Sequence, residues 1–293
     1  MENTVIRRRD LLISSLISVP MLGGLPAFAQ GREEEVREAL FALDRRHGGR
    51  LGVAILDSGS GRVIAHRGQE RFAMCSTFKF VAAAFVLARV DRGEESLDRR
   101  VSYTKTDLVT YSPVTEKHVD TGLTVAELCD AAVTLSDNAA GNLLLDSFGG
   151  PKGLTSYMRS LGDDSSRLDR RELELNEATP GDPRDTTTPV AMAQILRQTV
   201  LGAALSPASR HQLTAWLVAN KTGDKRLRAG VPKGWRVGDR TGTGSNNATN
   251  DIGVIWPPGR APLIVTAYYA ESRGSLPERE AVLAEVGRLA TSL

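Results

Sequence analysis

A serine and a lysine three residues apart stand at the start of an apolar stretch of the sequence. The motif is Ser76-Thr77-Phe78-Lys79, and the residues after it are mostly apolar as far as residue 90. If this stretch is a helix, the lysine amine lies one turn from the serine hydroxyl, at a helix start that favours developing negative charge. The amine can then contact the hydroxyl, a contact that can activate a serine as a nucleophile, although a helix-cap serine with a solvated lysine is the commoner meaning of such a match. A second match, Ser102-Tyr103-Thr104-Lys105, lies in a polar stretch with no apolar helix after it, so we predict that it lies on the surface.

Two further motifs place polar side chains beside predicted elements. Ser136-Asp137-Asn138 falls between a predicted helix over residues 124–134 and another that begins near Ala139. By itself this tripeptide is typical of a helix N-cap turn. Arg240-Thr241-Gly242 lies inside a predicted strand, where the glycine lets a ligand approach the backbone and the arginine supplies a positive charge. A literal Lys221-Thr222-Gly223 follows another predicted helix, and we interpret it as a helix-terminating loop.

These three motifs, in this order, resemble the Ser-x-x-Lys, Ser-Asp-Asn and Lys-Thr-Gly set of the penicillin-recognising serine enzymes. Residues 170–176 narrow the family, because Glu172 and Asn176 resemble the Glu-x-x-x-Asn loop of class A β-lactamases. With the segment from Tyr111 to His118, the resemblance extends from about residue 32 to the C-terminus. The sequence is therefore similar to class A serine β-lactamases, which open the lactam ring of penicillin-type antibiotics and confer resistance to them.

The resemblance implies a covalent mechanism centred on Ser76. This serine would attack the lactam carbonyl, while the backbone N–H groups of Ser76 and Thr243 hold the oxyanion. The resemblance leaves two candidates for the base in acylation, Lys79 and Glu172. Ser136 would pass a proton to the lactam nitrogen as that nitrogen leaves.

The resemblance also implies a deacylation step and a set of substrate-binding residues. Glu172 and Asn176 would position the water that hydrolyses the acyl-enzyme, and Asn138 would bond the amide of the substrate side chain. An arginine usually meets the carboxylate beside the lactam, and Arg226 matches its position in some relatives, whereas many members carry it where Thr249 stands. We expect penicillins and cephalosporins as substrates, and neither a cofactor nor a metal. The expected binding residues are Tyr111, Asn138, Asn176, Arg226, Arg240, Thr241, Gly242 and Thr243.

Three positions depart from common features of the family. Arg240 replaces the usual Lys, as in a subgroup noted for carbenicillin hydrolysis, which keeps the charge but presents a planar fork. Leu173 stands where a Pro is common, and we predict a cis Glu172–Leu173 bond because the carboxylate must face the cleft. The family's common disulfide partner of Cys129 corresponds to Ala83, so we predict that Cys129 and the other cysteine, Cys75, are free thiols.

Elements at both ends of the chain must hold these residues in place. The N-terminal part predicts a helix over residues 32–46 and a β-hairpin over residues 50–66. The C-terminal part predicts three strands and a final helix capped by Ser275, over residues 235–242, 251–256, 262–269 and 277–290. Between them the pattern is helical, with a capping box at Thr124 and helix starts at Pro151, Pro189 and Pro207.

This order of elements predicts an α/β fold. We expect an antiparallel five-stranded sheet from both chain ends, flanked by helices, with an inserted all-α subdomain and a cleft between the two parts. The α/β part would comprise residues about 30–70 and 231–293, and the all-α part residues about 71–230. Residues 161–188 resist assignment, and a loop so long is usually functional or disordered. The resemblance implies an omega loop from Arg170 to Asp185, closed by an ion pair between these two residues.

The composition is typical of a globular protein, and the N-terminal residues indicate export. The chain has 293 residues, 41% of them hydrophobic and 25% charged, and its net charge of +2 gives no reason to expect nucleic acid as a partner. The first 29 residues predict a removable signal, with Arg7-Arg8-Arg9, an apolar run over 11–25 and the cleavage site Ala27-Phe28-Ala29. Arg8-Arg9 also resembles the twin-arginine export signal. We expect a periplasmic or secreted monomer that has no membrane segment after cleavage.

Other classes of protein fit the sequence less well. A D-Ala-D-Ala peptidase or a penicillin sensor shares the first three motifs but lacks the deacylating loop of Glu172 and Asn176. A Ser-His-Asp hydrolase needs a Gly-x-Ser-x-Gly elbow, which does not occur in the sequence. A metal-dependent lactamase needs clustered ligands, whereas the four histidines are scattered: His47, His66, His118 and His211.

Overall fold

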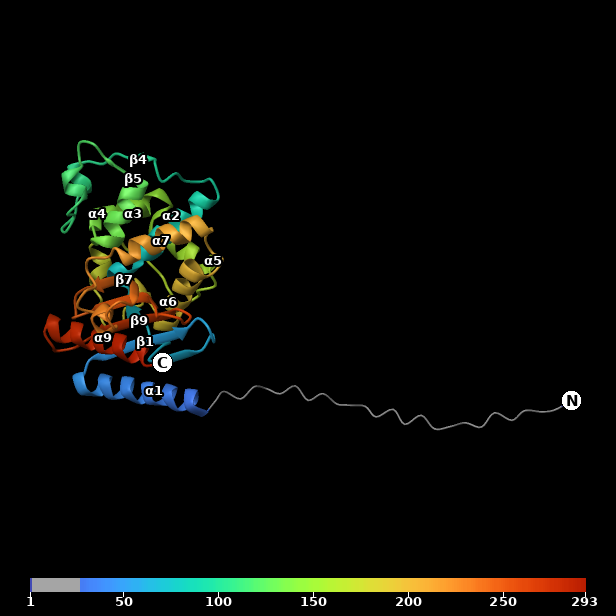
Figure 1. Cartoon of the computed structure of the whole chain (residues 1–293). Helices are drawn as coiled ribbons and strands as arrows, with labels where there is room; N and C mark the ends of the chain where they lie inside the picture. Colours follow the sequence, from blue (N-terminus) through green and yellow to red (C-terminus); the bar gives the residue numbers. More distant parts are fainter. Residues whose placement is uncertain (2–26) are drawn as a thin grey trace.

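Strands from the two ends of the chain pair in one sheet in the computed structural model, which describes Met1 and residues 27–293. The strand order is β2-β1-β9-β8-β7, and every neighbouring pair is antiparallel. The register places Val53 opposite Ala267 and Arg240 opposite Ile252. The strands are β1 (Arg50–Asp57), β2 (Val63–His66), β7 (Arg236–Thr243), β8 (Thr249–Trp256) and β9 (Leu263–Ala270). Figure 1 shows this sheet in the lower half of the molecule, in blue and orange.

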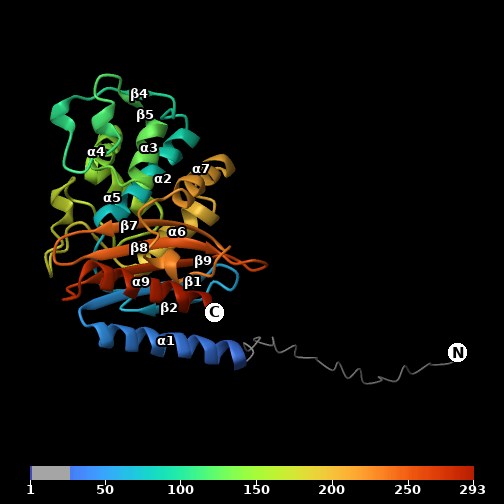
Figure 2. The ribbon, with the colours of Figure 1, turned by 60° about the vertical axis from the view of Figure 1, so that its left-hand side comes forward.

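Helices from both ends of the chain cover one face of the sheet. These are α1 (Ala27–His47) and α9 (Leu276–Thr291), which lie on the side away from the rest of the molecule (Figure 2). Because side chains alternate along a strand, Val53 packs toward these two helices while Ala54 packs into the other core. The sheet therefore separates two apolar clusters, one under the terminal helices and one shared with the helical part.

The helical part of the molecule is built around α2 (Phe78–Asp91). Ten of its residues are buried, since it is apolar on nearly all sides and other helices surround it. The helices that contact α2 are α3 (Val125–Thr134), α4 (Asn138–Ser147), α5 (Gly150–Ser160) and α7 (Pro207–Val218), whereas α6 (Pro189–Leu196) packs against the sheet and α8 (Leu227–Gly230) against α9. The short pieces are β3 (Phe72–Ala73) paired with β6 (Thr186–Thr187), β4 (Arg100–Val101) paired with β5 (Leu123–Thr124), and the single turns η1 (Cys75–Thr77), η2 (Lys105–Asp107), η3 (Thr115–Lys117), η4 (Glu174–Asn176) and η5 (Arg197–Leu201).

The fold class predicted from the sequence is confirmed, and most element boundaries agree closely. The sheet, the hairpin and the helices that begin near the three prolines are present, with the capping box at Thr124. Helix α1 begins at Ala27 rather than at residue 32, because the intervening residues include the helix formers Ala and Gln. The predicted signal, residues 1–29, lies outside the described residues apart from Met1 and 27–29. Among the described residues, every helix is too short or too polar to cross a membrane.

Candidate active site

Ser76 lies on a single tight turn, η1, that leads directly into α2. The preceding Cys75 has a left-handed φ of +46°, which turns the chain sharply between β3 and the helix. The Nζ of Lys79 lies 3.1 Å from the Oγ of Ser76, as expected for two residues one helical turn apart. The hydroxyl of Ser76 also lies 3.3 Å from Oε1 of Glu172 and can donate to it. The nucleophile candidate thus lies between an amine and a carboxylate.

The amine of Lys79 is fully enclosed by acceptors from three parts of the chain. It lies 2.5 Å from Oδ1 of Asn138, 3.0 Å from the carbonyl oxygen of Ser136 and 2.9 Å from Oε1 of Glu172. Burial lowers the pKa of Lys79 to about 8, although the neighbouring carboxylate of Glu172 acts in the opposite direction. The lysine is therefore much closer to neutrality than a surface lysine.

The Ser136-Asp137-Asn138 turn combines a helix cap with two polar side chains that contact Lys79. Asp137 is fully buried and caps α4 by accepting the N–H of Ala140, and it also accepts the N–H of Thr115. This use of Asp137 fixes the turn. Ser136, which has a φ of +64°, and Asn138 are then directed toward Lys79. The helix-cap interpretation is therefore confirmed at Asp137, and the same turn places Ser136 and Asn138 in contact with Lys79.

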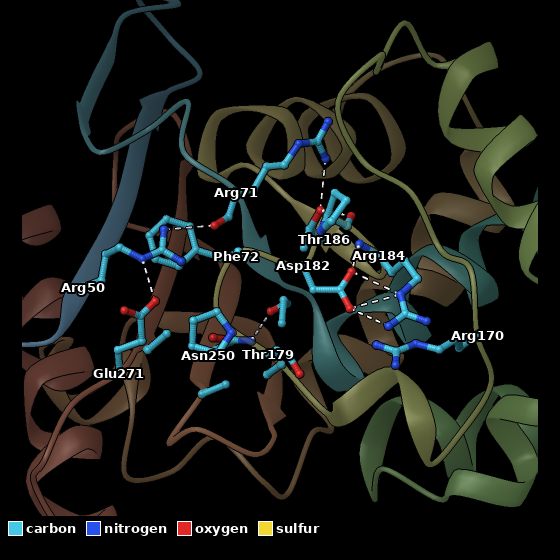
Figure 3. Close-up of a pocket in the computed structure, with 17 residues that line it drawn as sticks. Arg50, Arg71, Phe72, Arg170, Thr179, Asp182, Arg184, Thr186, Asn250 and Glu271 are labelled. Atoms are coloured by element: carbon cyan, nitrogen blue, oxygen red, sulfur yellow. Dashed lines mark hydrogen bonds and ion pairs between the residues drawn. The ribbon is translucent and has the colours of Figure 1, made fainter.

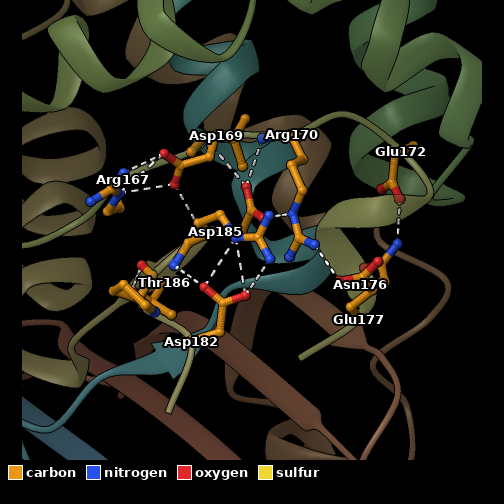
Figure 4. Close-up of polar contacts among 12 residues, drawn as sticks. Arg167, Asp169, Arg170, Glu172, Asn176, Glu177, Asp182, Asp185 and Thr186 are labelled. Atoms are coloured by element: carbon orange, nitrogen blue, oxygen red, sulfur yellow. Dashed lines mark hydrogen bonds and ion pairs between the residues drawn. The ribbon is translucent and has the colours of Figure 1, made fainter. Parts of the chain in front are cut away.

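Glu172 is held by both its backbone and its side chain. The side chain of Asn142 bonds the N–H and the C=O of Glu172, each at 3.0 Å, and the amide of Asn176 bonds Oε2. The Glu172–Leu173 peptide bond is cis, which confirms the sequence-based prediction. Both cysteines are free, as predicted. Figure 4 shows Glu172 and Asn176 directed toward each other at one end of the loop.

The omega loop, residues 170–185, is closed by the predicted ion pair. The Nε of Arg170 lies 2.6 Å from Oδ2 of Asp185, and the other oxygen of Asp185 accepts two backbone N–H groups, from Asp169 and Arg170 (Figure 4). Asp185 is fully buried, so these contacts satisfy its charge away from water. Arg170 also pairs with Glu177 farther along the loop.

Strand β7 forms the opposite wall of the cleft. Arg240 is fully buried and donates to the Oγ of Ser136 at 2.7 Å, and burial lowers its pKa to about 10, so it remains charged at neutral pH. A Cβ on Gly242 would lie 2.8 Å from the carbonyl oxygen of Met74. Only glycine therefore lets the strand run so close to the turn that carries Ser76.

The comparisons with known proteins agree with this geometry. Residues 32–293 match the model of the β-lactamase enzyme family. The chain is 46% identical to β-lactamase CTX-M-8 of Citrobacter amalonaticus, over 98% of this chain and 97% of that protein. It is 48% identical to β-lactamase AST-1 of Nocardia asteroides, over 94% and 87%. The solved structure of an ancestral (GNCA) class A β-lactamase superposes with a TM-score of 0.87 at 67% identity, over 87% of this chain and 98% of that one. The chain belongs to the class A β-lactamases.

The cleft of this class A β-lactamase collects most of the residues singled out from the sequence. It is a cavity of about 320 Å³, comparable to sites that bind small molecules. Tyr111, which is largely exposed, lies at its rim. The lining residues are Ser76, Tyr111, Ser136, Asn138, Asn176, Thr222, Arg226, Thr241, Gly242 and Thr243. Lys79, Glu172 and Arg240 lie behind this lining, in contact with Ser76 or Ser136.

Arg226 reaches the cleft from the residue before α8. Its Nη1 donates to the carbonyl oxygens of Gly242 and Asn250 at 2.9 and 2.8 Å, and its Nη2 donates to Oγ1 of Thr243 at 2.8 Å. Glu280 accepts from its Nε at 3.4 Å. In this class A β-lactamase the arginine therefore supports strand β7 in addition to bringing a positive charge to the cleft.

Sequence reasoning missed two residues of this site. Asn142 anchors Glu172, and its position one helical turn after Asn138 was the available signal. Thr222 belongs to the Lys-Thr-Gly motif that we interpreted only as a loop, yet its Oγ1 lies 2.6 Å from Oγ1 of Thr241. The second Ser-x-x-Lys motif is on the surface as predicted, with Ser102 and Lys105 both exposed. No group of three metal-binding side chains occurs within the described part of the chain.

A second hollow of about 310 Å³ lies on the outer side of the omega loop. Figure 3 shows its arginines already engaged: Arg50 with Glu271, Arg184 with Asp182, and Arg71 with the hydroxyl of Thr186. Arg170, the fourth, pairs with Asp185. Two of these pairs lie within the omega loop, and the other two tie Arg50 and Arg71 to residues just after β9 and just after the loop.

Proposed function

We propose that this protein hydrolyses penicillins and cephalosporins through an acyl-enzyme on Ser76. The placement of the Ser76 hydroxyl between two groups that can handle its proton carries this proposal. Lys79 donates to the Ser76 oxygen at 3.1 Å, and Oε1 of Glu172 lies 3.3 Å away as an acceptor. Such a nucleophile can form a covalent intermediate without a metal or a cofactor.

Acylation needs a base, an oxyanion site and a proton for the leaving nitrogen. Either Glu172 or neutral Lys79 can take the serine proton, and the backbone N–H groups of Ser76 and Thr243 stabilise the oxyanion. The hydroxyl of Ser136 then protonates the lactam nitrogen. Arg240, whose guanidinium donates to that hydroxyl at 2.7 Å, stabilises the negative charge that develops there.

Deacylation distinguishes a β-lactamase from an enzyme that penicillin merely inhibits. The carboxylate of Glu172 and the amide of Asn176 contact each other and together position a water molecule for attack on the ester. Asn138 and Tyr111 bind the substrate side chain, while Arg226, Thr241 and Thr243 receive the carboxylate beside the lactam. The substrate is therefore oriented by both walls of the cleft.

Replacement of the deacylating carboxylate tests this assignment. We expect Glu172→Gln to acylate but barely to turn over, because Asn176 alone cannot deprotonate the water. Mass spectrometry after mixing with benzylpenicillin should show a persistent adduct on Ser76.

The matched control for this experiment is Glu174→Gln, two residues away on the same loop and exposed. This variant should turn over like the wild-type protein and retain no adduct. Wild-type turnover by Glu172→Gln would mean that another group activates the water, and the role of Glu172 would then be wrong.

We also propose where and in which form the protein acts. The first 29 residues direct export to the periplasm by the twin-arginine route and are then removed. The mature protein acts as a monomer, since every residue assigned to catalysis comes from one chain.

A further inference from the structure

Thr222 reaches the catalytic cleft from a tightly packed loop after α7. The N–H of Lys221 donates to the carbonyl oxygen of Thr134 at 2.9 Å, which ties this loop to the end of α3. A Cβ on Gly223 would lie 1.6 Å from Oδ2 of Asp239, so only glycine permits the loop to lie against β7. The position of Thr222 is therefore fixed from both sides.

The hydroxyl of Thr222 has two partners but only one proton. Its Oγ1 lies 2.8 Å from Oδ1 of Asn220 and 2.6 Å from Oγ1 of Thr241. The backbone N–H of Thr222 also donates to Oδ1 of Asn220, at 3.1 Å, which identifies that atom as an acceptor. If Thr222 donates to Asn220, then Thr241 must donate to Thr222. In the protein without substrate, the proton of Thr241 then points toward Thr222 and away from the cleft.

Thr241 stands where an anion would be received. Its oxygen lies 3.3 Å from Nη1 of Arg240, so it accepts from a positively charged group. A hydroxyl that accepts from one donor can still give its single proton to an anion. In the free enzyme, however, Thr222 competes for this proton.

We propose that Thr222 is a positioning residue for the carboxylate that penicillins and cephalosporins carry. When the carboxylate enters the cleft, Thr222 turns its proton from Asn220 to Thr241, and Thr241 turns its own proton to the carboxylate. The two threonine hydroxyls together donate two hydrogen bonds before the carboxylate binds and two after it has bound. In the bound state, donation by Thr222 makes Thr241 a stronger donor to the carboxylate. The inference depends on the proposed function, because it needs a β-lactam in this cleft.

Removal of the Thr222 hydroxyl tests the proposal. We expect Thr222→Val to raise KM for benzylpenicillin by about twofold to fourfold, because the charge-assisted bond from Thr241 to the carboxylate loses the cooperative strengthening that donation by Thr222 supplies. The loss falls on KM rather than on kcat, because the carboxylate is bound equally before and during reaction. Thr222→Ser should restore most of the affinity, since it keeps the hydroxyl.

A neutral substrate separates this role from a merely structural one. The methyl ester of benzylpenicillin has no carboxylate, so its kcat/KM should differ by less than about twofold between the wild-type protein and Thr222→Val. The matched control is Thr106→Val, which removes an exposed hydroxyl that lies 2.6 Å from that of Thr104, outside the residues that line the cleft. It should leave both substrates unaffected.

A double-mutant cycle with Thr241→Val completes the test. If Thr222 acts through Thr241, the second substitution adds nothing in the Thr241→Val background. An independent, additive effect, or an equal loss on the ester, would overturn the role of Thr222. Absence of lactam hydrolysis by the wild-type protein would instead contradict the proposed function itself.

Discussion

At the scale of single residues, the proposed mechanism makes the activation of Ser76 depend on the protonation state of Lys79. With its pKa lowered by burial to about 8, the amine is mostly charged at pH 7 and donates to the serine oxygen. The serine proton is then directed at Oε1 of Glu172, at 3.3 Å. As the pH rises through 8, the amine loses its proton and becomes able to act as the base. Under the proposed mechanism, acylation through Glu172 is therefore expected below pH 8 and acylation through neutral Lys79 above it, which a pH profile of kcat/KM for wild-type protein and Glu172→Gln would separate.

Another residue-scale prediction concerns Arg226 and the substrate carboxylate. A charge-assisted bond to a carboxylate contributes roughly 1.5–3 kcal/mol, so Arg226→Ala should lower kcat/KM for benzylpenicillin about tenfold to a hundredfold. Steady-state kinetics measure the effect, and a thermal melt separates it from the loss of support for β7. Adding Thr249→Arg should partly restore kcat/KM. An unchanged kcat/KM in Arg226→Ala would mean that Arg240, Thr241 and Thr243 suffice.

At the scale of elements, the omega loop behaves as one unit that presents Glu172. Its two ends are joined by Arg170 and Asp185, and Asn142 of α4 grips the backbone of Glu172 from the other side. The position of the Glu172 carboxylate is thus fixed by the closed ends of the loop and by the bonds of Asn142 to the backbone of Glu172. Rigid support of this kind suits the role that we propose for Glu172, because the proposed deacylation depends on the placement of a single water molecule.

Removing the ion pair that closes the loop should weaken both stability and deacylation. In Arg170→Gln the buried carboxylate of Asp185 loses its cation, which should lower the free energy of unfolding by about 2 kcal/mol and reduce kcat. Arg171→Gln is the matched control, since its pair with Asp146 is exposed and worth less than about 0.5 kcal/mol. Chemical denaturation and steady-state kinetics check both variants. Equal stability of the two variants would contradict this role of the ion pair.

At the scale of the whole molecule, the cleft lies where the helical part meets the sheet. Ser76 lies just before α2, in the helical part, whereas Arg240 belongs to β7, which pairs with the C-terminal strand β8. Strand β7 is joined to β1 through β8 and β9, so the strand that carries Arg240 belongs to a sheet built from both ends of the chain. The two walls of the cleft therefore come from parts of the chain that are distant in sequence.

At this scale we predict that the enzyme is exported after it has folded. If the twin-arginine route is used, replacing Arg8 and Arg9 by Lys should keep the protein in the cytoplasm as an uncleaved precursor. In cell fractions of the unaltered protein, the periplasmic form should begin at Gln30 by mass spectrometry and elute as a monomer from a sizing column. Normal periplasmic export of the double-Lys variant would assign the signal to another route.

The sequence by itself determined those features that depend on neighbours along the chain. The Ser76 and Lys79 pair, the cap at Asp137 and the glycine at position 242 are read from spacing, because one helical turn or one strand fixes how such residues face each other. Alternation and turn residues predicted the sheet. The resemblance of residues 170–176 to the Glu-x-x-x-Asn loop predicted a hydrolase rather than an enzyme that stays acylated.

Only the tertiary structure decided which residues distant in sequence share the cleft. Thr222 looked like a loop residue because nothing near it in sequence shows that Thr241 lies 2.6 Å away. Arg226 was placed by resemblance alone, and its bonds to Gly242, Asn250 and Thr243 depend on how α8 packs against β7. The lowered pKa of Lys79 likewise follows from burial by surrounding elements. Such contacts arise from packing between separate elements, and local spacing cannot encode which of these elements meet.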